Sequence, residues 1–232
     1  MLPADQRREV FARIREALRV PAPHHHVVKG HSAAHDDGLP GASEFSAWLP
    51  SVGATLDEQH ALFAQNSLGL KTEVHACTSL DEAATVLHTL ATENNWKQLA
   101  THRHPLTTAL AEKITLPKIT TDAGYAIPDL ERSDAALTGC DTLVAQTGTI
   151  LVTNRSAGGR ALSVLPPHHI VIARRGQMVP DLATALREAR TRYAPGWPSF
   201  LSFITGPSRT GDIERILVLG AHGPKKLTIL CH

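Results

Sequence analysis

Three short segments in the second half of the chain combine hydroxyls, cations and glycines at spacings suited to binding an anion. Thr147-Gly148-Thr149 separates two β-type runs, where backbone N–H groups and hydroxyls can converge on a carboxylate or phosphate. Ser208-Arg209-Thr210 follows a hydrophobic run and adds a guanidinium for bidentate recognition. Gly158-Gly159-Arg160 allows a second cation and the backbone to approach a ligand closely. The predicted anion-binding residues are Thr147, Gly148, Thr149, Arg160, Ser208, Arg209 and Thr210.

Each segment also has a purely structural interpretation. A glycine-bearing turn between two strands needs no ligand. Ser208 and Thr210 could cap a short helical turn. Arg209 could pair with Asp212 or Glu214 instead of a ligand. Both interpretations stay open at the level of the sequence.

His168 and His222 are the candidates for proton transfer, although the sequence assigns no catalytic residue. His168 is followed by His169 in a predicted buried strand, where adjacent side chains point to opposite faces, so at most one of the two faces a site. His222 stands near glycines after another strand. A structural role is the alternative for each. The histidines between residues 24 and 35 lack a rigid scaffold, so no metal site is predicted.

Composition excludes several classes of function. The 232 residues carry a formal net charge of +1 and only 4% aromatics, so a nucleic-acid partner is not expected. No apolar run approaches the roughly 20 residues that cross a bilayer, which predicts a cytoplasmic protein without membrane insertion. The three cysteines are far apart and form no Cys-x-x-Cys pair, so no bound cofactor or iron-sulfur cluster is expected. Common nucleotide-binding, metalloprotease and esterase motifs do not occur.

Hydrophobic periodicity predicts an N-terminal amphipathic helix in residues 1–20, a Pro-, Gly- and His-bearing flexible linker at 21–42 and an α/β domain at 43–232. Capping-box pairs predict helices that begin after Thr55 and after Ser79. Further helices are predicted at 105–113, 161–165 and 181–193, and strands at 71–77, 96–101, around 118, 142–145, 149–153, 169–173, 200–204 and 215–219. This alternation favours an open mixed sheet with flanking helices.

Taken in order, these segments resemble the LUD domain of the lactate-utilization protein C family. The resemblance covers about residue 141 to the C-terminus. It rests on Thr147-Gly148-Thr149, Arg160, Leu165-Pro166-Pro167-His168-His169-Ile170, Gly206-Pro207-Ser208-Arg209-Thr210, Asp212-Ile213-Glu214 and Gly220-Ala221-His222-Gly223-Pro224. The combination and its order carry the resemblance.

The resemblance implies a fold similar to the NagB/RpiA/CoA-transferase-like group. It also implies a component without its own redox centre that acts with an iron-sulfur subunit and another redox subunit in the oxidation of L-lactate to pyruvate in bacteria, binding a small carboxylate or phosphate. Independent turnover does not follow from the sequence. One alternative is a stand-alone isomerase or transferase acting on a phosphorylated or CoA-linked metabolite. Another is an interaction module whose N-terminal helix docks on a partner.

Overall fold

The computed structural model describes residues 4–17, 19, 50–210 and 218–232, and the chain divides into two compact units at Trp48 and Leu49. In the first unit, helix α1 (Ala4–Ala17) confirms the expected N-terminal helix. Arg13 and Glu9 form an ion pair of 2.8 Å one turn apart, and Val10 and Ile14 are about half exposed. The predicted linker at 21–42 lies outside the described residues.

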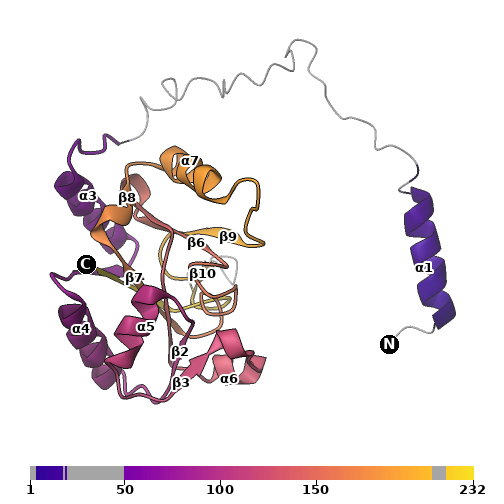
Figure 1. Ribbon diagram of the computed structural model, residues 1–232, viewed down its shortest axis with the longest axis horizontal. Coiled ribbons are helices and arrows are strands. Elements are labelled where there is room, and N and C mark those ends of the chain that lie inside the picture. The colour runs from indigo at the N-terminus through magenta and orange to yellow at the C-terminus, as the bar shows by residue number, and fades with distance from the viewer. Residues whose placement is uncertain (1–3, 18, 20–49, 211–217) are drawn as a thin grey trace, which may run out of the picture. The chain divides into compact units, whose positions relative to one another are not determined.

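Within the second unit, the main sheet contains six parallel strands among the described residues, in the order β1-β12-β7-β4-β2-β3. Its strands β7, β2 and β3 are labelled in Figure 1. The strands are β1 (Thr72–Ala76), β2 (Leu99–Thr101), β3 (Lys118–Thr120), β4 (Ala135–Thr138), β7 (His168–Ala173) and β12 (Lys226–Cys231). The central strands β4 and β7 are buried along their whole length, as expected for a parallel sheet covered on both faces.

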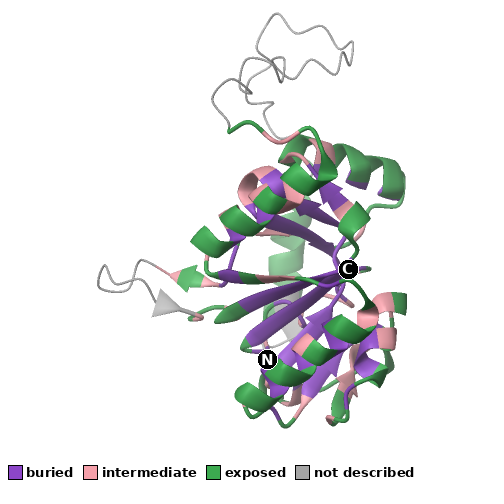
Figure 2. Cartoon of the chain, turned by 90° about the vertical axis from the view of Figure 1, so that its left-hand side faces the viewer, coloured by how far each residue is buried: buried purple, intermediate pink, exposed green. Residues whose placement is uncertain are grey.

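Helices α4 and α5 pack on one face of this sheet through a core that includes Leu87, Leu110 and Ile172. Among the described residues, the helices of the second unit are α3 (Leu56–Gly69), α4 (Leu80–Glu93), α5 (Pro105–Glu112), α6 (Ile127–Glu131) and α7 (Leu182–Tyr193), with 3-10 turns at Thr121–Ala123, Ala145–Thr147 and Arg175–Gln177. Figure 2 shows the buried strands enclosed by helices whose outer surfaces are exposed. No helix within the described residues is long and apolar enough to cross a membrane.

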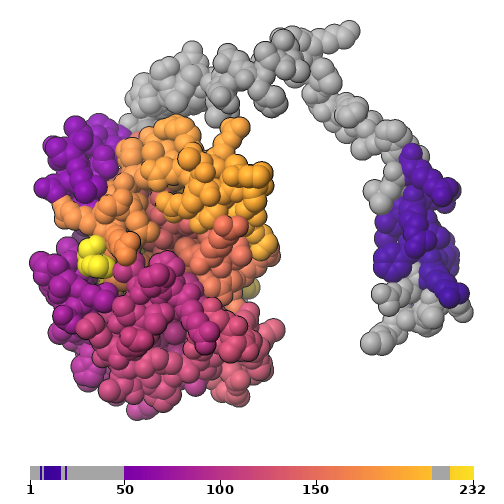
Figure 3. All heavy atoms as spheres, viewed as in Figure 1, coloured from indigo at the N-terminus to yellow at the C-terminus, as the bar shows by residue number. Residues whose placement is uncertain are grey.

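The other face of the main sheet packs on a second sheet and on α3, through a core that includes Phe63, Ile150 and Val171. In the described chain this sheet has the order β8-β5-β6-β9, with β8 (Met178–Val179), β5 (Thr142–Val144), β6 (Thr149–Thr153) and β9 (Leu201–Ile204). Helix α7 covers its far side. Figure 3 shows the orange segments around α7 and the magenta segments around α5 at opposite ends of one face of this unit.

The expected α/β class is therefore confirmed, but the mixed pairing belongs to the second sheet and the main sheet is parallel. The strands predicted on either side of Gly148 are present as the antiparallel pair β5 and β6, which form a hairpin. The predicted helix at 161–165 is wrong, because this segment forms turns. Its last residue precedes Pro166 and Pro167, and a residue before proline is disfavoured in the helical conformation.

Candidate functional site

A cavity of about 220 Å³ lies between the beginning of β7 and β12 on one side and strand β9 of the second sheet on the other. Most of its walls are apolar, and its polar side chains are hydroxyls and imidazoles. Its lining residues are Ser163, Val164, His169, Phe200, Ser202, Ile204, Gly206, Pro207, Ser208, His222, Gly223, Pro224 and Leu227. Three segments singled out in the sequence, 165–170, 206–210 and 220–224, thus contribute residues to one cavity.

The alternation of side chains along β7 decides which histidine reaches this cavity. His169 shares its face of the strand with Val171, which packs in the core toward the second sheet. His168 shares the opposite face with Ile170, which packs toward α4 and α5. The cavity is therefore lined by His169, and the sequence candidate His168 lies on the other side of the sheet.

His169 is a buried, neutral imidazole with a fixed tautomer. The Thr138 hydroxyl donates to the carbonyl oxygen of Gly139 at 2.9 Å, so its oxygen accepts a hydrogen bond from Nε2 of His169 at 2.8 Å. The proton on Nε2 leaves Nδ1 as an acceptor. Burial, with a smaller contribution from His168, lowers the pKa of His169 from 6.5 to about 3.

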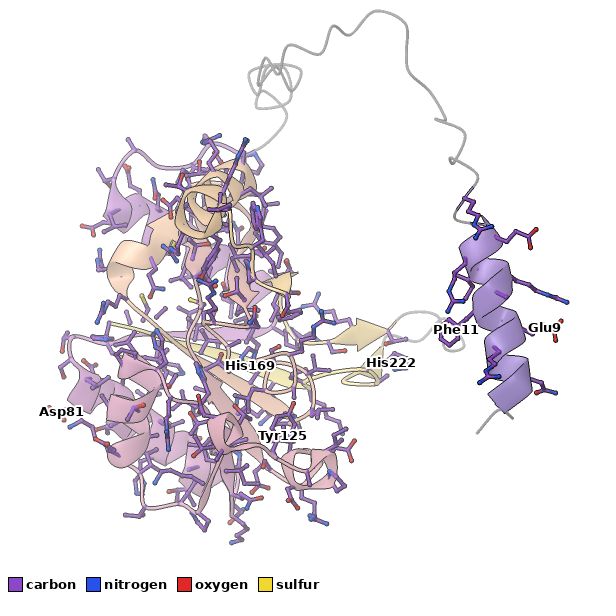
Figure 4. The ribbon with its side chains drawn as sticks, turned by 45° about the vertical axis from the view of Figure 1, so that its right-hand side comes forward. Glu9, Phe11, Asp81, Tyr125, His169 and His222 are labelled. Carbon is purple, nitrogen blue, oxygen red and sulfur yellow. The ribbon has the colours of Figure 1, made fainter. Side chains whose placement is uncertain are left out.

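Ser208 and His222 are held on two turns that are tied together. The Ser208 amide donates to the carbonyl oxygen of Pro224 at 2.9 Å, and the Gly220 amide donates to the carbonyl oxygen of Ser208 at 2.9 Å. A Cβ atom at Gly223 would lie 3.1 Å from Cβ of Ser208, so the glycine allows this close approach. In Figure 4, His169 lies inside the domain, whereas the exposed His222 lies on a turn that extends from it.

The Thr147-Gly148-Thr149 segment lies outside this cavity and forms the turn between β5 and β6. Gly148 adopts a left-handed conformation (φ 62°) directly against α3, where Asn66 donates to the carbonyl oxygens of Ala145 and Gln146 at 3.0 Å each. The Thr149 hydroxyl lies 2.8 Å from that of Thr205. The contacts of this segment therefore hold the hairpin to α3 and to the residue that follows β9.

The predicted cations contact backbone carbonyls. Arg160 donates to the carbonyl oxygen of Ser199 at 2.8 Å, and its guanidinium carbon lies 5.5 Å from the ring centre of Phe200, a wall of the cavity. Arg209 donates to the carbonyl oxygen of Leu70 at the end of α3. Thr210 pairs with Val218 in the short ribbon formed by β10 (Arg209–Thr210) and β11 (Val218–Leu219). This ribbon replaces the helical turn considered as an alternative, whereas Asp212 and Glu214 lie outside the described residues.

Comparison with known proteins identifies the family, because the LUD domain matches residues 61–231, most of the chain. The chain belongs to the LUD domain family. The family expected from the sequence motifs is thereby confirmed.

Several relatives of this LUD domain carry the name Lactate utilization protein C. The one from Deinococcus radiodurans is 38% identical over 103 residues, which cover 44% of this chain and 48% of the relative. The one from Halalkalibacterium halodurans is 35% identical over 106 residues, covering 45% and 46%. The matched region thus spans about half the length of these relatives.

A solved structure supports the fold. A DUF162 family protein from Deinococcus radiodurans has a TM-score of 0.62 and 23% identity, covering 77% of this chain and 99% of that chain. At this identity the likeness shows the fold alone.

The sequence did not single out the buried carboxylate of Asp141. It accepts hydrogen bonds from Ser156 at 2.6 Å, from Tyr193 and from Arg192 at 3.2 Å, and so joins the end of α7 to the hairpin of this LUD domain. Burial, followed by the bond to Asp141, raises the pKa of Tyr193. In the sequence, the only signal for Asp141 is that it directly precedes the predicted strand at 142–145.

The side chains of the cavity can recognise a ligand through hydrogen bonds. Its hydroxyls can donate to a carboxylate, Nδ1 of His169 can accept, and apolar side chains can contact an alkyl group. Among the described residues, no group of three His, Cys, Asp or Glu side chains could hold a metal ion.

Proposed function

We propose that this LUD-domain chain is a component of a bacterial system that oxidises L-lactate to pyruvate. The convergence of three distant family segments on one cavity carries the proposal. Relatives named Lactate utilization protein C support lactate as the metabolite. In this proposal the electrons pass to iron-sulfur and other redox subunits, and the chain itself binds a small anion.

The polarity of the cavity suits a 2-hydroxy carboxylate. In our proposal Ser208 donates to the carboxylate, and the substrate hydroxyl donates to Nδ1 of His169, the nitrogen left unprotonated by the bond to Thr138. The apolar walls then contact the methyl group. Arg160 lies against Phe200 and places a positive charge beside one wall.

The experiment is growth on L-lactate as sole carbon source of a strain whose chromosomal copy is deleted and complemented by variants. Wild type and the control Ser51→Ala, an exposed serine outside the cavity, should restore growth. Ser208→Ala should slow it, because a lost hydrogen bond to a charged group weakens binding by about tenfold. Immunoblotting checks that the variants accumulate equally.

Arg209→Ala separates two roles of that guanidinium. If Arg209 only bonds the carbonyl oxygen of Leu70, the variant supports growth as wild type does once its abundance is matched. If Arg209 also contacts the anion, growth slows at equal abundance. Normal growth of the deletion strain without another lactate oxidase would remove lactate from the proposal and make phosphorylated ligands the next test.

A further inference from the structure

A second and larger cavity, of about 430 Å³, lies on the opposite face of the main sheet, between α4 and strands β1, β12 and β7. This volume lies within the range of roughly 300–1,000 Å³ that holds small molecules. Val86 and Leu90 of α4 give it an apolar side. Its polar lining includes Glu73, His75, Glu93, Asn94, His168 and Lys226.

A chain of hydrogen bonds orients the buried histidine of this cavity. Thr228 donates its hydroxyl proton to the carboxylate of Glu73 at 3.1 Å, so its oxygen accepts from Nε2 of His168 at 2.8 Å. Nδ1 of His168 is left as an acceptor, and within the described residues it has no hydrogen-bond partner. The ring is neutral, because burial and then Lys226 lower the pKa of His168 to about 4.

The charges around the cavity leave an excess of acceptors. Lys226 donates to the amide oxygen of Asn94 at 2.7 Å, and in the described part of the chain it forms no ion pair with Glu73 or Glu93. Two carboxylates and one ammonium give a net charge of about −1 beside the neutral ring of His168. Nε2 of His75 is also shielded from solvent without a partner among the described residues.

We propose that this cavity binds a small primary amine, whose ammonium group donates to Glu73 and Glu93 and whose alkyl chain contacts Val86 and Leu90. An ammonium supplies N–H donors and a positive charge, which match the two carboxylates. The two carboxylates are largely exposed, so binding is weak, in the millimolar range. This site lies on the opposite face of the main sheet from the cavity proposed to bind lactate, and it does not depend on that proposal.

The test is isothermal titration of the full chain with putrescine, with the neutral diol of the same chain length as a matched probe. We expect putrescine to bind and the diol to give no saturable heat. Glu93→Gln should weaken binding by about two- to fivefold, and the double variant Glu73→Gln/Glu93→Gln by about tenfold. Glu131→Gln, an exposed carboxylate outside the cavity, is the control and should bind as wild type does.

Lys226→Gln gives a test in the opposite direction. Removal of the like charge should tighten putrescine binding by about two- to fivefold, which a damaged fold would not do. The proposal is overturned if wild type does not bind putrescine at millimolar concentrations, if the diol binds as well, or if the double variant binds as tightly as wild type.

Discussion

At the residue scale, the adjacent histidines of β7 share one device on opposite faces of the sheet. Each ring donates a hydrogen bond from Nε2 to a threonine hydroxyl. Each threonine hydroxyl in turn donates a hydrogen bond to an oxygen that can only accept, the Gly139 carbonyl or the Glu73 carboxylate. The tautomer is therefore set by the neighbours of the threonine. Both rings keep Nδ1 as an acceptor, and each lines a cavity.

The neutral state of His169 makes stability depend on pH. Its pKa is about 3 in the folded chain and about 6.5 when unfolded, so the unfolded state binds more protons between these values. The contribution is complete above about pH 6.5 and is lost as the pH falls toward 3. Between pH 6 and pH 5, we expect the unfolding free energy of wild type to fall by about 1 kcal/mol more than that of His169→Gln, measured by urea denaturation.

His88→Gln is the matched control, because His88 is exposed on α4. It should show the same loss of unfolding free energy with falling pH as wild type. Parallel pH profiles for wild type and His169→Gln would contradict the burial of a neutral imidazole.

At the element scale, local signals predicted the helices better than the strands. The capping box at Thr55 and Glu58 is present in full, with bonds of 3.2 and 2.9 Å. At Ser79 the hydroxyl caps α4, but the carboxylate of Glu82 bonds Thr78. These bonds span at most four residues, so they can be inferred from sequence spacing.

Strands β4 and β12 escaped prediction because their pairing depends on distant partners. Ala135–Thr138 is four residues long and buried on both faces, so it shows no polar alternation. Lys226–Cys231 lies between β1 and β7, which are separated by about 90 residues of chain. Only the assembled sheet makes such short runs into central strands.

The candidate site was only partly predictable, because its assembly also depends on contacts between distant segments. The segments holding Ser208 and His222 were singled out, and the structure places both at one cavity. The alternation of side chains along β7 showed that only one of its two histidines could face any one site. Which histidine that is depends on which layer covers each face of the sheet, and the sequence does not give this. Packing against α4 and against the second sheet settles that choice for His168 and His169.

The turn between β5 and β6 gives a prediction for Gly148. A Cβ there would lie 2.9 Å from the amide nitrogen of Ser67, and the backbone has φ 62°. The hydrogen bonds from Asn66 to the carbonyl oxygens of Ala145 and Gln146 hold α3 against this turn. We expect Gly148→Ala to lower the unfolding free energy by about 2 kcal/mol and Tm by about 4–8 °C, measured by calorimetry.

Gly176→Ala controls for the loss of a glycine as such. A Cβ at Gly176 meets no atom within 4 Å and its φ is not positive, so the change should stay within about 0.5 kcal/mol. Equal stabilities of the two variants would show that Gly148 is not needed for the contact with α3.

At the scale of the whole molecule, the parallel sheet separates two cavities. Both lie where β7 and β12 begin, whereas open parallel sheets more often bind ligands beyond the carboxyl ends of their strands. One cavity is closed by the second sheet and the other by α4. A ligand in either one would contact β7 and β12, so these two strands connect the sites physically.

The division of the chain at Trp48 and Leu49 allows the interaction-module hypothesis to be tested directly. The four buried clusters of the described residues are built from Val52 onward, so a chain of residues 49–232 should fold and unfold with a Tm within about 2 °C of the full chain. If α1 docks on a partner subunit, the shortened chain loses partner capture while its Tm is unchanged, as differential scanning calorimetry and co-purification from the native host would show. A large fall in Tm would instead mean that residues 1–48 stabilise the domain, and unchanged capture would exclude α1 as the docking element.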